Sequence, residues 1–177
     1  MPDEAPAHLF GRTSCCHGLE NCLATKGNEE FHPLKMSKTY TNPTIPFKIN
    51  IKLVEQKHFV IIGRPLSDDK RFTFNFQKGL LSDAPNIAFQ FDVNCRNRVI
   101  AMNYRFDSTW GREIREITKF PFSEKDQFTL EIMVDSQMYE VKVNDEEVAQ
   151  FQHQRSMEVV DAFTIEGDVV LSEVKVM

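Results

Sequence analysis

Apolar and polar residues alternate along short stretches of this chain, from about residue 44 to its end. The clearest stretch is IAFQFDVN at residues 87–94, where apolar residues from Ile87 to Val93 are spaced two apart. In a β-strand this period sends one set of side chains to a core and the intervening set to the opposite face. The pattern therefore predicts a strand with one buried face and one polar face.

Further strands are predicted from the same kind of pattern, with turn residues between them. These runs lie at residues 47–54, 59–62, 72–76, 98–105, 128–134, 139–143, 148–151, 163–165 and 169–176. Helical periodicity is absent from all stretches longer than about 12 residues, and only residues 155–161 suggest a single helical turn. We therefore predict an all-β fold, a two-sheet antiparallel β-sandwich of about eleven strands.

The chain divides by pattern into two parts. Residues 1–40 show neither helical nor strand periodicity and contain several prolines and glycines, so we expect a flexible N-terminal extension. Residues 41–177 are expected to form the folded domain. Its core should consist largely of phenyl rings, since the chain has 15 phenylalanines and one tryptophan.

Three of the four cysteines crowd the extension, at Cys15, Cys16 and Cys22, near His8 and His17. Thiolates and imidazoles are zinc ligands, but structural zinc sites normally offer separated ligand pairs and not adjacent cysteines. A reduced segment without metal is the favoured interpretation, and we expect no metal and no cofactor. Reduced cysteines and the lack of a signal peptide predict a cytoplasmic protein, with export by a non-classical route left open.

Composition excludes several classes of partner. Hydrophobic residues make up 41% and charged residues 27% of the chain, and the net charge is −5. This charge gives no reason to expect nucleic acid as a partner, and no apolar run is long enough for membrane insertion. Catalysis is not expected either, because no nucleophile motif or poised carboxylate pair is present.

Candidate binding chemistry gathers between residues 90 and 115. The only tryptophan, Trp110, has small or polar neighbours, and its indole is either a core residue or an exposed platform for a sugar ring. Glu113 and Arg115 are two residues apart and share a strand face, where they either bracket a sugar diol or form a solvent-exposed ion pair.

Two motifs then give a resemblance to a known family. WGREIRE at residues 110–116 and FPF at residues 120–122 resemble the W-G-x-E-x-R…F-P-F signature of galectins, and Asn103 stands seven residues before the tryptophan. The similarity extends from about Thr44 to Met177. It implies a galectin or concanavalin A-like jelly roll and a lectin that binds β-galactoside-containing glycans without a cofactor.

The resemblance also implies the sugar-contacting residues. Galectins usually carry H-x-N-x-R where this chain has Gln90, Asp92 and Asn94, so altered or weakened specificity is expected. The expected carbohydrate-binding set is Asn103, Trp110, Glu113, Arg115, Gln90, Asp92 and Asn94.

Three alternatives remain open at this point. In the first, Asp92 bonds Arg115 and withdraws it from the ligand. In the second, the domain is a galectin-fold interaction module that has lost sugar binding. A homodimer is one candidate assembly.

Overall fold

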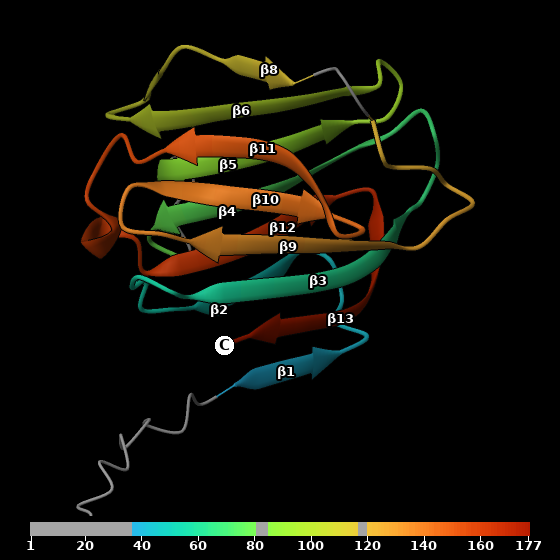
Figure 1. Ribbon diagram of the computed structural model, residues 1–177, viewed down its shortest axis with the longest axis horizontal. Helices are drawn as coiled ribbons and strands as arrows, with labels where there is room; N and C mark the ends of the chain where they lie inside the picture. The colour runs from blue at the N-terminus through green and yellow to red at the C-terminus, as the bar shows by residue number, and fades with distance from the viewer. Residues whose placement is uncertain (1–36, 81–84, 117–119) are drawn as a thin grey trace, which may run out of the picture. The chain divides into compact units, whose positions relative to one another are not determined.

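Two antiparallel sheets packed face to face form the domain, as the computed structural model shows (Figure 1). The structure describes residues 37–80, 85–116 and 120–177, and the candidate zinc ligands of the extension lie outside them. The six-stranded sheet has, in spatial order, β1 (Lys38–Thr41), β13 (Val169–Val176), β3 (His58–Pro65), β9 (Phe128–Val134), β10 (Met138–Val143) and β11 (Glu146–Gln152).

The second sheet lies behind the first in the view of Figure 1. Its seven strands are β2 (Phe47–Asn50), β12 (Ala162–Gly167), β4 (Arg71–Lys78), β5 (Asn86–Asn94), β6 (Val99–Phe106), β7 (Thr109–Trp110) and β8 (Ile114–Glu116). β7 and β8 pair with different parts of β6. The predicted two-sheet antiparallel sandwich is confirmed.

The described residues form thirteen strands, two more than the approximate prediction. β1 and β7 were missed because they are short and mostly exposed, so neither has a buried apolar alternation. β1 pairs with β13 from Lys38 to Thr41, and the expected domain boundary after residue 40 falls inside it.

The strand predicted over residues 47–54 ends at Asn50. Its partner β12 begins at Ala162, opposite Asn50, so the ladder ends there, apart from the hydrogen bond that the Ile51 amide donates to the Asp161 carbonyl at 2.9 Å. The helical turn predicted near residue 157 is confirmed as a 3₁₀ helix, η1 (Met157–Val159), which Ser156 caps by accepting from the Glu158 amide. Among the described residues, no helix is long and apolar enough to cross a membrane.

Aromatic rings from both sheets fill the space between them. Phe89 of β5 stacks on Tyr139 of β10 with ring centroids 4.5 Å apart, and Phe59 of β3 meets Phe76 of β4 edge-on at 4.9 Å. All four side chains are fully buried. Such ring pairs add about 0.5–1.5 kcal/mol each to the burial of apolar area. This packing fixes which face of β4, β5 and β6 points outward.

Removing residues 1–35 should leave the melting temperature within about 2 °C of that of the full chain, since every described strand lies after this segment. Thermal unfolding followed by circular dichroism is the measurement. Removing residues 1–41 is the control, because it deletes β1 and the 5.1 Å contact of Tyr40 with Phe47, and should lower the melting temperature. A fall of many degrees in the shorter truncation would show that the extension is part of the folded domain.

Candidate functional site

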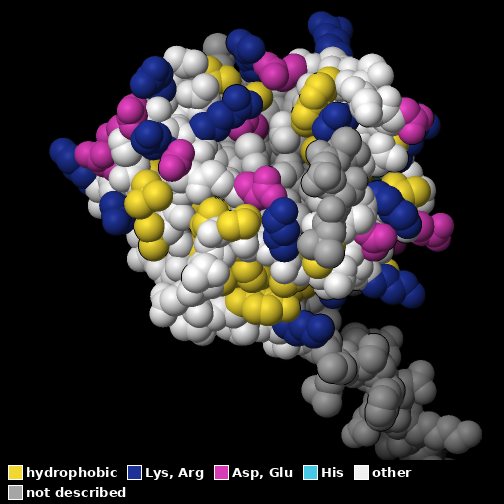
Figure 2. Space-filling view, turned by 180° about the vertical axis from the view of Figure 1, so that it is seen from behind, with side chains coloured by type: hydrophobic (Ala, Val, Ile, Leu, Met, Phe, Trp, Pro, Cys, Tyr) yellow, Lys and Arg dark blue, Asp and Glu magenta, His cyan; other side chains and the backbone are white. Residues whose placement is uncertain are grey.

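Polar side chains line the outer face of the seven-stranded sheet because the alternating phenylalanines of β4 and β5 point inward. Figure 2 shows this face, on which basic and acidic side chains are interspersed and not separated by sign. Several of these polar residues are nearly buried, among them Asn75, Asp92 and Asn103. Buried polar groups need hydrogen-bond partners, so their side chains are expected to be fixed in position.

Gln90 belongs to a row of hydrogen bonds that crosses three strands. Its Nε2 donates to Asn75 Oδ1 at 3.0 Å, and Asn75 Nδ2 donates to Thr164 Oγ1 at 3.2 Å. Asn75 faces both Gln90 on β5 and Thr164 on β12 in the strand register. The side chain of Gln90 is therefore held toward β4 and β12.

A two-residue turn places Trp110. Asp107 and Ser108 join β6 to β7 with φ values of 48° and 64°, as a type I′ hairpin turn requires. The turn sets Trp110 opposite Arg105, whose guanidinium lies 5.7 Å from the centre of the indole ring. The indole is 44% exposed, so the core interpretation of the tryptophan is excluded.

Gly111 is needed after the tryptophan because of a close approach. A β-carbon at this position would overlap the ring of Tyr104. The Gly111 amide also donates to the Tyr104 carbonyl at 2.9 Å. The chain is thereby held against β6 before it enters the segment that carries Glu113 and Arg115.

A cavity of about 190 Å³ opens on this face. It is lined by Arg71, Asp92, Asn94, Asn97, Val99, Ala101, Glu113 and Arg115. Four of the seven predicted site residues share this cavity. Gln90, Asn103 and Trp110 are not among its lining residues, although Gln90 and Asn103 face each other on β5 and β6.

Asp92 pairs with an arginine, but not with the one expected. Arg71 Nε donates to Asp92 Oδ1 at 2.5 Å, whereas Arg115 Nε donates to Glu113 Oε1 at 2.5 Å. The alternative in which Asp92 bonds Arg115 is therefore wrong. In the strand register Asp92 lies opposite Thr73, and Arg71 is two residues before Thr73 on β4. Glu113 is two residues before Arg115 in the sequence.

Asp92 is a carboxylate taken largely out of water, with its side chain only 4% exposed. Burial raises the pKa of Asp92 above its usual value, the hydrogen bond and charge of Arg71 oppose this, and the charge of Glu113 adds to it. The bond to Asp92 in turn raises the pKa of Arg71. The pair is thus a buried anion held by a cation whose side chain is 60% exposed.

The remaining predicted residues have local partners. Asn94 Oδ1 accepts from the Asn97 amide at 3.1 Å and so stabilises the β5–β6 turn. Asn103 Oδ1 accepts from the Tyr104 amide at 2.8 Å. Within the described part of the chain, no hydrogen bond engages the amide nitrogen of either side chain.

Arg71 is the charged residue lining this cavity that the sequence did not predict. It precedes the alternating run of residues 72–76, where it read as an ordinary charged residue at a strand end. Its role depends on its neighbour Asn94 across the β4–β5 ladder, and this register is not visible in the sequence. The signal that existed was the acidic residue at position 92, which needs a cation once it is buried.

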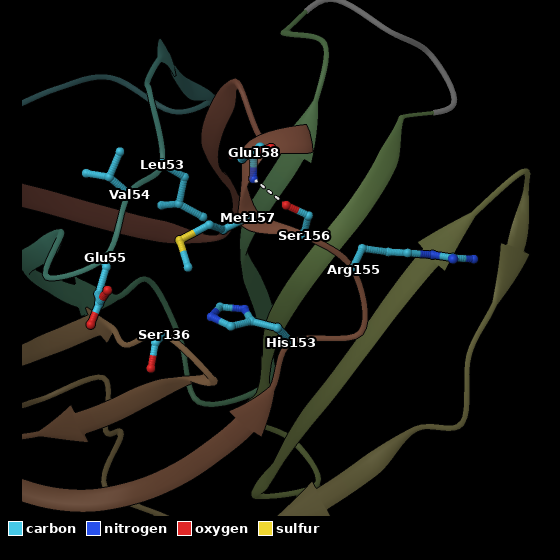
Figure 3. A pocket seen from close by; sticks show the side chains of 9 residues that line it. All are labelled: Leu53, Val54, Glu55, Ser136, His153, Arg155, Ser156, Met157 and Glu158. Carbon is cyan, nitrogen blue, oxygen red and sulfur yellow. Dashed lines mark hydrogen bonds between the residues drawn. The ribbon is translucent and has the colours of Figure 1, made fainter.

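A larger cavity, of about 360 Å³, lies elsewhere, where His153 and the η1 helix meet Leu53, Val54 and Glu55 (Figure 3). None of the predicted site residues lines it. In Figure 3, Arg155 points away from the other labelled side chains, and its guanidinium lies 4.9 Å from the ring centre of Phe106. His153 Nε2 lies 2.8 Å from the Asp135 carbonyl oxygen, so this ring nitrogen already has a partner.

Metal chemistry has no support in the described part of the chain. No group of three or more histidine, cysteine, aspartate or glutamate side chains is arranged there to hold an ion. Cys95 is buried, and this burial raises its pKa to about 11, so its thiol stays protonated.

Comparison with known proteins decides the family. The model of the galactoside-binding lectin family matches residues 44–176. The chain belongs to the galectins. Galectins are binding proteins, and this membership agrees with the expectation that the chain is not an enzyme.

Individual galectins are similar over most of this chain. Galectin-3 of Cricetulus longicaudatus is 30% identical over 135 residues, which cover 73% of this chain and 53% of that protein. Human galectin-4 is 29% identical over 165 residues, which cover 91% of this chain and 47% of that protein. The chain thus spans about half the length of these curated relatives.

A solved structure shows the same fold. Sheep galectin-11, in complex with glycerol, superposes with a TM-score of 0.70 at 26% identity, covering 75% of this chain and 97% of that one. The expected jelly-roll architecture of the galectins is confirmed.

The ionisation of Asp92 should be measurable by NMR, from the chemical shift of its side-chain carboxyl carbon during a pH titration. We expect a midpoint above 3.8, and a higher one in Arg71→Met, because the arginine is the main group that lowers this pKa. The pKa of Asp92 is higher in the folded chain than in the unfolded chain, so Asp92 contributes to stability at pH values below its unfolded pKa. This contribution is lost as the pH rises through the folded pKa. A midpoint below 3.8 would show that the ion pair outweighs burial.

Proposed function

We propose that this protein is a lectin for β-galactoside-containing glycans, with altered or weakened specificity. The observation that carries the proposal is the outer-face cavity that holds Glu113, Arg115 and Asp92. An exposed tryptophan on β7 of the same sheet completes the set. The proposed contacts centre on Asn103, Trp110, Glu113 and Arg115, with Gln90, Asp92 and Asn94 modifying specificity.

The polar groups of the cavity suit a neutral sugar. Two guanidinium groups and two carboxylates line it, so its formal charge is balanced when all four are ionised. Each sugar hydroxyl both donates and accepts a hydrogen bond, and the cavity offers both kinds of partner within a small volume. Arg115 and Glu113 are 67% and 40% exposed, which leaves atoms of each available to a ligand.

Trp110 would contribute the apolar contact. The C–H face of a galactose ring is apolar, and a half-exposed indole offers it a flat surface. Arg105 lies beside the same ring and orients it by a cation–π contact.

Altered specificity follows from residues on β5. Gln90 donates to Asn75, Asp92 accepts from Arg71, and Asn94 caps the following turn. Each has therefore committed polar atoms to the protein, and the donors that the galectin motif offers from this strand are reduced. A cytoplasmic location and a homodimer remain predictions from the sequence.

Retention on immobilised lactose tests the proposal. We expect the full chain to be retained and then released by free lactose. Passage without retention, with no binding on an array of β-galactosides, would favour the alternative of an interaction module that has lost sugar binding.

Replacing Trp110 with alanine should abolish measurable lactose binding while the fold is kept. The indole is exposed, so its removal leaves no core cavity, but it takes away the stacking surface. Isothermal titration calorimetry measures the affinity and circular dichroism the fold. Met133→Ala is the matched control, because Met133 is 38% exposed on β9 of the other sheet. This variant should bind lactose as the native chain does. Unchanged affinity in Trp110→Ala would place the sugar elsewhere.

Lactose binding should also be the same in calcium and in chelator. The described residues contain no cluster of ligands for an ion, so recognition is expected to use direct hydrogen bonds and stacking. The comparison uses parallel lactose titrations, one with calcium at about 1 mM and one with EDTA. Calcium at this concentration occupies even weak protein sites to a large extent. Binding that disappears in EDTA and returns with calcium would refute this expectation.

A further inference from the structure

Arg71 occupies a special place beside the proposed sugar site. It lies on β4, directly opposite Asn94 of β5, the asparagine that stabilises the β5–β6 turn. Neighbouring strands are about 4.8 Å apart, so the guanidinium enters the site from the adjoining strand. Arg71 lines the same cavity as Glu113 and Arg115.

One end of the Arg71 guanidinium is fixed by a hydrogen bond. Its Nε donates to the buried carboxylate of Asp92. Among the described residues, no hydrogen bond or ion pair engages its two terminal nitrogens, and the side chain is 60% exposed. An arginine held in this way presents a planar pair of amino groups without losing further side-chain freedom on binding.

The floor of the cavity leaves room between the two arginines. Arg115 on β8 lies opposite Ala101 on β6, and Ala101 lies opposite Asp92 on β5. Val99 and Ala101 are the short side chains that line this stretch of the sheet. Arg71 and Arg115 are thus separated by β5 and β6, and a ligand in the cavity meets a guanidinium from each side.

We infer that Arg71 contacts the sugar and supplies, from β4, the guanidinium donor that Asn94 cannot supply from β5. Asp92 is its positioning residue and acts by fixing Nε, so that the terminal amino groups face the cavity. This inference rests on the proposed function, since it assigns a residue to the same sugar site. It also explains why an acidic residue is tolerated at position 92, inside a site that must donate hydrogen bonds.

Titration calorimetry of the full chain with lactose tests the inference. Arg71→Met should weaken binding about tenfold or more, since a hydrogen bond from a charged donor is lost. Because this change leaves Asp92 buried without a cation, Arg71→Met/Asp92→Asn is the second variant, in which neither charge remains. It should bind as weakly as Arg71→Met alone. Arg155→Met, an exposed arginine outside the site, should bind as the native chain does.

Two further variants separate positioning from folding. Asp92→Asn should weaken binding in the native background but have little effect once Arg71 is methionine, because Asp92 acts through that residue. Adding Asn94→Arg to Arg71→Met/Asp92→Asn should recover much of the lost affinity, since it returns a guanidinium to the neighbouring strand. Melting temperatures of all variants show that each is folded when binding is measured.

The outcomes distinguish the two claims. If the native chain binds lactose and the Arg71 variants bind it equally well, the inference is overturned and the proposed function stands. If Asp92→Asn weakens binding to the same extent in both backgrounds, Asp92 does not act through Arg71, and its positioning role is overturned. If the native chain binds neither lactose nor other β-galactosides, the proposed function fails and the inference fails with it.

Discussion

The packing of aromatic rings between the two sheets is the constraint on which the site depends. Phe74, Phe76, Phe89 and Phe91 are all fully buried between the sheets. Because side chains alternate along a strand, each buried ring forces its neighbours in the sequence to the outer face. The core thus places Gln90 and Asp92 on the outer surface, at a spacing set by the ladder and not by any contact with a ligand.

The polar side chains on this surface need hydrogen-bond partners and find them in one another. Asp92 is too buried to remain unpaired, and Arg71 meets it from the adjoining strand. Gln90 is bound to Asn75, and Asn94 to the turn that follows. These internal bonds use the side chains that the sequence offered as ligand donors. Among the residues that the structure describes, no hydrogen bond engages the terminal nitrogens of Arg71 and Arg115 at the two sides of the cavity. Preorganisation of this kind lowers the entropy lost on binding, at the expense of available donors.

Much of the fold was predictable from the sequence, because the alternation of Phe89 and Phe91 reports burial directly. β1 and β7 were not, since Lys38–Thr41 and Thr109–Trp110 bury too little to show a pattern. Four of the seven predicted site residues line one cavity, but their pairing was not predictable from the sequence. Asp92 meets Arg71 and not Arg115 because of strand register, and register is decided by contacts between distant segments.

The central claim is that a galactoside binds on the outer face of the seven-stranded sheet, at the Asp92 cavity and Trp110. The most direct measurement is a lactose titration of the ¹⁵N-labelled chain, followed by proton–nitrogen NMR. The account predicts concentration-dependent shifts of the indole Nε1 of Trp110 and of the side-chain Nε of Arg71 and Arg115. Shifts confined to the cavity around His153 would contradict it. So would the absence of shifts at roughly 10 mM lactose, a concentration well above a dissociation constant of about 1 mM.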